Sequence, residues 1–417
     1  MKPSRRAFLQ AAALGVAGST GKKPFSAAEA EEPNLAISTE LTKALGSLRT
    51  KTGLKIQRLE TFTGDTTVSF VRLRTDDGSE GIGQISPFDA DIAATLLHRK
   101  IAPHVLGADP GDFETLADVC IERNYKFPWS FICRALAGVD TAIWDLLGKR
   151  HKKSVCELLG GKPRPIAVYG SSMRRDIRPA DEARRLAKLR DDKGFTAFKV
   201  RVGKVTGHDE DQWPGRTEEL IPAVRKGVGD KVRLMADANS CYTAKKAIEV
   251  GRLLEQHGFY WFEEPCPYWE LEWTAEVAKA LTMHVAGGEQ DNDLAQWRRM
   301  VRLKAVGIVQ PDVCYVGGLT RALRVTQMAA GAMLQCVPHS ANLTLLTVFT
   351  LHLMAAIPNA GPFVEFSIEN TPWTNALYFP ALEVKDGQVP VPAGPGWGVD
   401  LNPAWLNKAT RKVSERK

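Results

Sequence analysis

Three short runs decide the fold: Val232–Asn239 (VRLMADAN), Tyr260–Pro265 (YWFEEP) and Val285–Gln290 (VAGGEQ). Each begins as an apolar, strand-like piece and then reaches an acidic side chain. Short apolar runs of this kind are typical of strands that are buried on both faces. Similar runs occur, with helical stretches between them, at Ala197–Val202, Ile308–Gln310, Met333–Val337 and Pro362–Phe366. The alternation predicts an α/β fold with a parallel sheet.

Polar, mostly charged side chains recur at the ends of these runs. They are Lys199 with Arg201, Asp237, Glu263, Glu289, Asp312, His339 and Glu365. Counted from Lys199, their separations are 38, 26, 26, 23, 27 and 26 residues. A βα unit of an eight-stranded barrel takes roughly 30 residues, and such barrels keep their active sites at the carboxyl ends of the strands. The spacing therefore predicts a TIM-type barrel with these side chains at its mouth.

The length of 417 residues predicts two or three domains at roughly 150 residues each. Strand patterns at Leu54–Phe62, Thr67–Arg74 and Gly81–Ile85 precede helical patterns that end near Arg150. Strands followed by helices predict a small α+β domain. The expected organisation is a linker over residues 31–52, an α+β capping domain over 53–165, the catalytic barrel over 166–380, and a C-terminal segment over 381–417 that returns to the capping domain.

The first thirty residues have the features of an export signal. Arg5-Arg6 precedes an apolar stretch from Ala11 to Ala17, and Ala28-Glu29-Ala30 offers a cleavage site. This pattern resembles a twin-arginine signal peptide; the alternative is a basic start with a short apolar helix. We therefore expect a periplasmic or other extracytoplasmic protein. Because no later apolar run reaches about 18 residues, we expect no membrane insertion after cleavage.

Composition excludes several other classes of protein. The chain is 44% hydrophobic and 25% charged, as in ordinary globular proteins. The formal charge is +7, but residues after 30 hold 50 basic and 47 acidic side chains, too even a balance for a nucleic-acid surface. The seven cysteines form no CxxC pair, so we expect buried free thiols rather than a zinc site or a disulfide framework.

The acidic and basic residues at the predicted mouth suit metal-assisted chemistry. Asp237, Glu263 and Glu289 would repel one another unless a cation joined them, and all-oxygen ligands suit one Mg²⁺ ion. Lys199 and Arg201 alternate along one strand and therefore face the same side. An outward, salt-bridging pair is the alternative for these two cations.

His339 is the candidate general base. Asp312 ends the preceding strand, where it can fix the imidazole tautomer and stabilise the imidazolium. A structural histidine is the alternative. Glu365 lies in the last strand, from which it can exchange a hydrogen bond with a substrate.

The spaced motifs at the predicted mouth, taken as a set, resemble the mandelate racemase-like subgroup of the enolase superfamily, the mandelate racemase/muconate lactonizing enzyme family. The set is Lys199-x-Arg201, Asp237, Glu263-Glu264-Pro265, Gly288-Glu289, Pro311-Asp312 and His339. Ala137–Asp145 and Gly394–Gly398 extend the resemblance over nearly all of the chain after residue 53. The resemblance implies a (β/α)7β barrel with an N-terminal capping domain that the C-terminal segment completes. It also implies a homo-oligomer.

The resemblance further implies that a small-molecule carboxylate is chelated to Mg²⁺, with Mn²⁺ as a substitute, and loses its α-proton to give an enediolate. Asp237, Glu263 and Glu289 would bind the metal. Lys199 would neutralise the substrate carboxylate, Asp312 and His339 would form the catalytic dyad, Glu365 would hydrogen-bond the enediolate, and Asn239 would contact the substrate.

One residue departs from the pattern of that family. Its usual Lys-x-Lys has a second base where this chain has Arg201, and a guanidinium stays protonated. A site with one base favours a metal-dependent lyase, a hydro-lyase that converts an acid sugar to a 2-keto-3-deoxy acid. The alternatives are a racemase or epimerase of a hydroxy acid and, in another class, an inactive exported carboxylate-binding protein.

The arginine pair generates a test of export. We expect the double variant Arg5→Lys, Arg6→Lys to remain in the cytoplasm, because the export machinery reads the guanidinium pair. Cell fractionation and immunoblotting would measure the distribution. Unchanged export of the double variant would contradict the signal assignment.

Overall fold

The computed structural model describes residues 39–65, 67–127 and 129–416. The predicted signal peptide, residues 1–30, and the first part of the expected linker lie outside the described residues, so export stays a prediction. Within the expected linker, helix α1 (Thr39–Leu48) buries Leu41, Leu45 and Leu48 and contacts α6 (Val155–Leu158). The second half of that segment is therefore packed against the rest of the fold.

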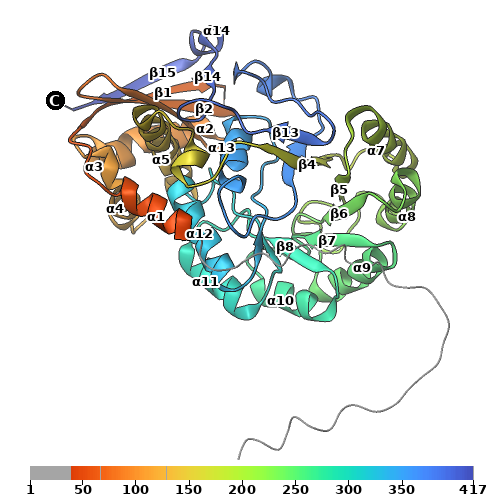
Figure 1. The fold of residues 1–417 in the computed structure, drawn as a ribbon. Coiled ribbons are helices and arrows are strands. Elements are labelled where there is room, and N and C mark those ends of the chain that lie inside the picture. The colour runs from red at the N-terminus through yellow and green to blue at the C-terminus, as the bar shows by residue number, and fades with distance from the viewer. Residues whose placement is uncertain (1–38, 66, 128, 417) are drawn as a thin grey trace, which may run out of the picture. The chain divides into compact units, whose positions relative to one another are not determined.

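The first domain contains an antiparallel sheet of strand order β15-β1-β2-β3. Three strands come from the start of the domain and one from the end of the chain: β1 (Ile56–Gly64), β2 (Val68–Thr75), β3 (Glu80–Ile85) and β15 (Thr410–Glu415). The register places Thr61 of β1 opposite Lys412 of β15. The C-terminal segment thus completes the sheet of the capping domain, as Figure 1 shows by colour, and this part of the predicted fold is confirmed.

Helices follow the sheet strands in sequence. They are α2 (Ala90–Leu96), the π-turn η1 (Leu97–Ile101), α3 (Ala102–Val105), η2 (Pro110–Asp112), α4 (Phe113–Glu122), α5 (Ser130–His151) and α6. The long helix α5 packs directly on β3 at small residues. A Cβ atom on Gly138 would lie 2.6 Å from Val71 Cγ2, and one on Gly83 would collide with the Gly138 carbonyl. Glycine at these positions therefore permits the close helix–sheet approach.

Buried carboxylates on α5 join this helix to the barrel, to β3 and to the C-terminal segment. Asp145 accepts backbone N–H bonds from Ile82 (2.8 Å) and Trp397 (2.9 Å), and Asp140 accepts one from Thr320 (3.1 Å) at the start of barrel helix α12 (Leu319–Gly331). These carboxylates satisfy backbone donors that burial would otherwise leave unpaired. The Ala137–Asp145 motif is thus a structural joint.

The barrel has strand order β10-β9-β8-β7-β6-β5-β4-β11, and β11 pairs in parallel with β4. Figure 1 labels its strands β4 to β8. Its strands are β4 (Pro165–Ser171), β5 (Ala197–Arg201), β6 (Arg233–Asp237), β7 (Phe259–Glu263), β8 (His284–Gly287), β9 (Ile308–Val309), β10 (Gln335–Cys336) and β11 (Val364–Ser367). The helices between them are α7 (Pro179–Lys193), α8 (Arg216–Val228), α9 (Ala244–Gln256), α10 (Leu271–Ala280), α11 (Leu294–Leu303), α12 (Leu319–Gly331) and α13 (Leu345–Met354). In the described residues this order is the predicted (β/α)7β barrel.

One layer of side chains fills the barrel interior. Each strand or its edge contributes one: Tyr169, Ala197, Met235, Trp261, Ala286, Ile308, Val337 and Phe363. Side chains alternate across a strand, so the residue two positions further on faces inward again, one layer closer to the carboxyl ends. That rule leads from Ala197 to Lys199, from Met235 to Asp237 and from Trp261 to Glu263. The sequence pattern and the barrel geometry therefore select the same side chains.

The chain after the barrel serves both domains. Its short elements are η3 (Pro372–Thr374), β12 (Tyr378–Phe379), β13 (Gln388–Pro390), β14 (Asp400–Leu401) and α14 (Pro403–Leu406). Strand β13 pairs antiparallel with β4 of the barrel, and the buried Trp397 indole donates to the Thr141 carbonyl of α5 (3.0 Å). All seven cysteines are buried and free, as predicted. Among the described helices, none combines the length and the apolarity that a bilayer crossing requires.

Candidate active site at the carboxyl ends of the barrel strands

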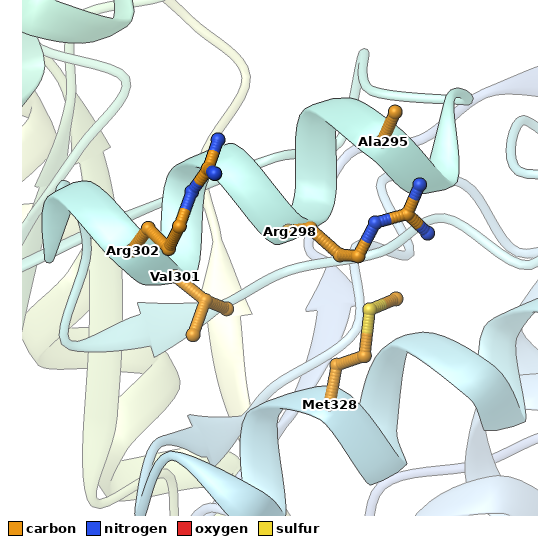
Figure 2. A pocket seen from close by; sticks show the side chains of 5 residues that line it. All are labelled: Ala295, Arg298, Val301, Arg302 and Met328. Atoms are coloured by element: carbon orange, nitrogen blue, oxygen red, sulfur yellow. The ribbon is translucent and has the colours of Figure 1, made fainter.

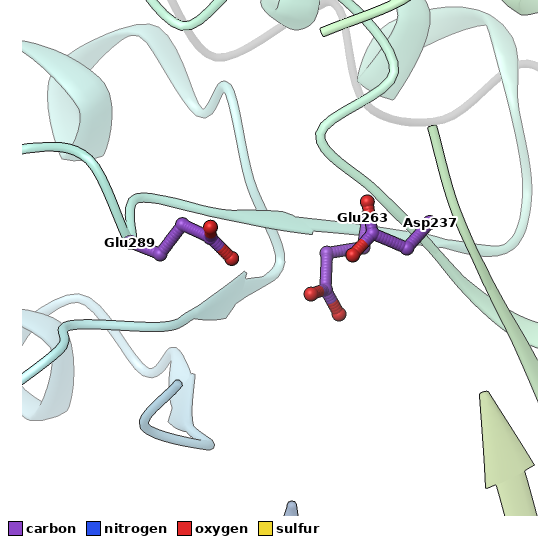
Figure 3. Close-up of side chains that lie close together, drawn as sticks. All are labelled: Asp237, Glu263 and Glu289. Atoms are coloured by element: carbon purple, nitrogen blue, oxygen red, sulfur yellow. The ribbon is translucent and has the colours of Figure 1, made fainter. Parts of the chain in front are cut away.

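Three carboxylates converge at the barrel mouth. Asp237 ends β6, Glu263 ends β7 and Glu289 follows β8, and Figure 3 shows their side chains turned toward a common space. One oxygen from each lies within 4.8 Å of the others, and all three side chains are buried. Gly288 makes the last position possible, because its φ of +111° is readily adopted only by glycine and a Cβ there would collide with Trp297.

Two cations from β5 face the carboxylates. Lys199 Nζ donates to Glu263 Oε1 and lies 2.9 Å from Glu365 Oε1 and 3.5 Å from Asp237 Oδ2. Arg201 Nη1 donates to Asp237 Oδ2. The prediction that Lys199 and Arg201 face the same side is confirmed, and the outward pair is excluded.

Attraction to the neighbouring carboxylates keeps Lys199 and Arg201 in their charged forms. Burial disfavours the ammonium of Lys199, but Glu263 and Glu365 outweigh it and raise its pKa well above the usual value. Burial likewise opposes the charged form of Arg201, whereas Asp237 raises the pKa of the guanidinium. Neither side chain can therefore accept a proton from a substrate near neutral pH.

Burial and charge act in opposite directions on the carboxylates. Burial raises the pKa of Asp237, but Arg201 and Lys199 outweigh burial, so the net shift is downward. Burial dominates at Glu263 and raises its pKa to about 7 despite Lys199, and burial also raises the pKa of Glu289. Burial thus disfavours the ionised forms of Glu263 and Glu289, and a bound cation would favour them.

His339 and Asp312 form a hydrogen-bonded pair. Nδ1 of His339 lies 2.8 Å from Asp312 Oδ2, and Nε2 lies 3.5 Å from Glu289 Oε2. The other oxygen of Asp312 accepts backbone N–H bonds from Cys314 (2.7 Å) and Tyr315 (2.9 Å). Asp312 can therefore accept from only one imidazole nitrogen, which leaves Nε2 to face the carboxylates.

The charge around His339 favours its imidazolium form. Burial lowers its pKa, but Glu289, the hydrogen bond to Asp312 and Glu365 together raise it to about 10. A divalent cation on Glu289 would offset the first of these attractions and would lower the pKa of His339 toward the range of a general base.

Glu365 is held as an anion between several donors. Its Oε1 accepts a hydrogen bond from Ser171 Oγ (2.7 Å), and its Oε2 accepts one from the backbone N–H of Ser340 (2.8 Å). Burial raises the pKa of Glu365, but Lys199 and His339 outweigh it, so the pKa lies well below the usual value.

Asn239 lies beside the metal-ligand candidates, and its amide oxygen accepts two hydrogen bonds. Its Oδ1 accepts from Arg201 (2.9 Å) and Arg175 (2.8 Å), and its Nδ2 donates to Glu264 (3.3 Å). The backbone has a φ of +42°, a left-handed conformation that asparagine tolerates. In this arrangement the amide organises Arg201 and Arg175 around Asp237.

Sequence reasoning missed several side chains at this centre. Gln310 and Ser171 each follow an interior residue by two positions, so the two-residue period of the strands was the signal that could have found them. Arg175 and Glu264 lie in turns, where no such period applies. Trp261 reads as core, and only its indole N–H bond to Glu263 (3.0 Å) connects it with the site.

The donor set fits a hard divalent cation. The candidate ligands are all carboxylate oxygens, which Mg²⁺ prefers. Glu264 adds a further carboxylate, and its buried Oε1 has no hydrogen-bond partner among the described residues. Burial and the charges of Glu289 and Asp237 raise the pKa of Glu264 well above its usual value. A cation at Asp237, Glu263 and Glu289 would relieve this excess of negative charge.

A surface pocket of about 470 Å³ lies elsewhere, between α11 and α12 (Figure 2). Ala295, Arg298, Val301, Arg302 and Met328 line it. None of these residues belongs to the carboxylate centre. The pocket therefore has no part in the chemistry described above.

Fold and site together define an enolase-type enzyme: a (β/α)7β barrel, a capping domain and an acidic centre on three successive strand ends. Residues 52–160 match the mandelate racemase / muconate lactonizing enzyme N-terminal domain, and residues 181–405 match the enolase C-terminal domain-like family. The chain belongs to the enolase superfamily, in its mandelate racemase / muconate lactonizing enzyme group. The predicted resemblance is confirmed.

Known relatives cover most of the chain. Arabinonate dehydratase of Saccharolobus solfataricus is 30% identical over 337 residues, 79% of this chain and 87% of that enzyme. A crystal structure from Roseobacter denitrificans, provisionally described as a racemase, is 54% identical with a TM-score of 0.86 and covers 87% of this chain and 100% of its own. L-Talarate dehydratase from Polaromonas sp. JS666, solved with Mg and L-glucarate, is 27% identical with a TM-score of 0.76 and covers 87% and 100%.

The carboxylate centre predicts cation-dependent stability. At a Mg²⁺ concentration of 100 times Kd, we expect stabilisation of about 2.7 kcal/mol, seen as a rise in the melting temperature. Glu263→Gln should abolish most of this rise, because the site loses a negative charge. Differential scanning fluorimetry with and without Mg²⁺ would measure it, with the exposed Glu276→Gln as the matched control. Equal Mg²⁺-induced shifts in both variants would contradict the metal assignment.

Proposed function

We propose that this enzyme removes the proton α to the carboxylate of an acid sugar and expels a β-hydroxyl, giving a 2-keto-3-deoxy acid. The carrying observation is that the centre offers one histidine–aspartate pair and two cations that carboxylates hold in the charged state. Among the described side chains, the centre combines one histidine base with two cations, neither of which can act as a second base. One base suffices for elimination, whereas racemisation by the two-base route needs two.

Each side chain of the centre has a separate role in the proposed reaction. His339, oriented by Asp312, takes the α-proton at Nε2 and, as the imidazolium, can return it to the departing hydroxyl. Lys199 neutralises the substrate carboxylate, and Arg201 supports it as a fixed positive charge. Glu365, which is held as an anion, accepts a hydrogen bond from a protonated oxygen of the enediol intermediate. Asn239 contacts the substrate or holds the guanidinium groups that do.

Asp237, Glu263 and Glu289 would hold one Mg²⁺, and Mn²⁺ has the same preference for oxygen ligands. When bound, such a cation supplies Lewis-acid stabilisation of negative charge that develops on carboxylate oxygens, worth several kcal/mol. The Mg in the L-talarate dehydratase structure and the acid sugar substrates of the named relatives support this proposal.

A racemase or epimerase is the second candidate, favoured by the provisional description of the Roseobacter denitrificans protein at 54% identity. Product analysis separates the two reactions, since a dehydratase yields a keto acid and an epimerase yields a stereoisomer. An inactive carboxylate-binding protein would give neither product. Export through the twin-arginine route remains part of the proposal.

Substitution of His339 tests the proposed dehydration. We expect His339→Asn to abolish both keto-acid formation and exchange of the α-proton, because His339 is the side chain to which we assign the proton transfer. Asp312→Asn should lower both rates by orders of magnitude, since it spoils the tautomer and the charge stabilisation of His339. A screen of sugar acids by a keto-acid assay, with exchange in deuterated water followed by NMR, would measure these effects.

The matched control is His257→Asn, because His257 lies after α9 and outside the site. Retained α-proton exchange in His339→Asn, together with loss of exchange in an Arg201 variant, would show that the base lies on β5 and would contradict the assignment of His339.

A further inference from the structure

One oxygen of Glu263, Oε2, already accepts hydrogen bonds from two other side chains of the barrel interior. The indole Nε1 of Trp261 donates to Glu263 Oε2 at 3.0 Å, and Gln310 Nε2 donates to the same oxygen at 2.8 Å. The three side chains are at most 1% exposed, so no water competes for these bonds at the surface. The other oxygen, Oε1, faces Lys199 on the side of Asp237 and Glu365.

Both donors are held rigidly. Trp261 lies in the interior layer two residues before Glu263, where its ring meets Tyr169 edge-on with centroids 5.5 Å apart. Gln310 follows β9, and its backbone N–H donates to the Gly287 carbonyl at 3.0 Å. Because a carboxylate only accepts hydrogen bonds, Gln310 must turn its amide NH₂ toward Glu263. Its own Oε1 has no partner among the described residues, a cost that the bond to the carboxylate offsets.

We infer that Trp261 and Gln310 are positioning residues that assign separate tasks to the two oxygens of Glu263. Their hydrogen bonds hold Oε2 within the barrel interior, which leaves Oε1 as the oxygen that Glu263 offers to a divalent cation. The inference rests on the proposed function only in that a cation binds at this centre. It holds whichever reaction the enzyme catalyses.

The arrangement also fixes how an amide at position 263 would lie. Two N–H donors face the Oε2 position, so Glu263→Gln must place its carbonyl oxygen there and turn its NH₂ group toward the cation. Glu289 is held less tightly, since the hydrogen-bond donor to its Oε1 is the partly exposed Gln290 at 3.0 Å. We therefore expect Glu263→Gln to weaken Mg²⁺ binding more than Glu289→Gln does.

Isothermal titration of the full chain with MgCl₂ tests the inference without a substrate. Gln310→Leu and Trp261→Phe should each weaken Mg²⁺ binding by about 10-fold, the usual scale for partners that orient a metal ligand. The control Gln335→Leu, which changes an amide on the neighbouring strand β10 that accepts from Tyr260 (3.3 Å), should leave the affinity within about 2-fold of wild type. Melting temperatures would verify that each variant is folded.

A combined variant tests whether the orientation of the amide at position 263, and not the stability of the fold, determines the Mg²⁺ affinity. In Glu263→Gln with Trp261→Phe and Gln310→Glu, no N–H donor remains at this position, so the new carboxylate accepts from the amide NH₂ and turns the carbonyl oxygen toward the cation. This triple variant should bind Mg²⁺ about 5-fold more tightly than Glu263→Gln with Trp261→Phe. A gain no larger than that of Gln310→Glu in the wild-type background would come from the added charge and would contradict the positioning role.

The outcomes separate this inference from the proposed function. Wild-type Mg²⁺ affinity in folded Gln310→Leu and Trp261→Phe, or no rescue in the combined variant, would overturn the positioning roles while leaving the dehydratase proposal intact. Weakened binding with rescue, in an enzyme that forms no keto acid, would support the positioning roles and reject the dehydratase. Absence of Mg²⁺ binding to the wild-type chain would reject the inference and the metal assignment together.

Discussion

The concentration of buried carboxylates at one end of the barrel is the constraint on which the site depends. Asp237, Glu263 and Glu289 lie where water cannot screen them, and burying an unpaired charge is costly. Lys199 and Arg201 compensate part of the charge, but burial still raises the pKa of Glu263 to about 7. The cluster gains the protein no stability, and its all-oxygen donor set fits a divalent cation.

The rest of the fold positions these charges. The interior layer with Trp261 supports the strand ends from below, and the inward period of two residues delivers one side chain from each strand to the mouth. The capping domain is fastened to the barrel through α5, whose buried Asp140 accepts a backbone hydrogen bond from Thr320 of the barrel. Asp145 of the same helix joins β3 to the C-terminal segment. The C-terminal strand β15 then completes the sheet of that domain.

Much of this was readable from the sequence because the signals are local. An apolar run followed by an acid identifies a strand end, and its recurrence about every 26 residues identifies the barrel. The sequence did not reveal Gln310 and Trp261 as partners of Glu263, because those contacts join different strands or require a side chain that reads as core. Helix α1 was also missed, since its three buried leucines are spread through a polar segment. Arg175 lies in a turn, where only the folded chain brings it to Asn239.

Binding of a single divalent cation by the carboxylates of Asp237, Glu263 and Glu289 is the proposal on which the other assignments depend. The most direct test is a crystal structure of the protein grown with Mn²⁺, whose anomalous scattering locates the ion independently of any activity. We expect one anomalous peak among these three side chains, bound by Glu263 through Oε1 while Oε2 keeps its bonds to Trp261 and Gln310. No peak there, or a peak at other residues, would contradict it.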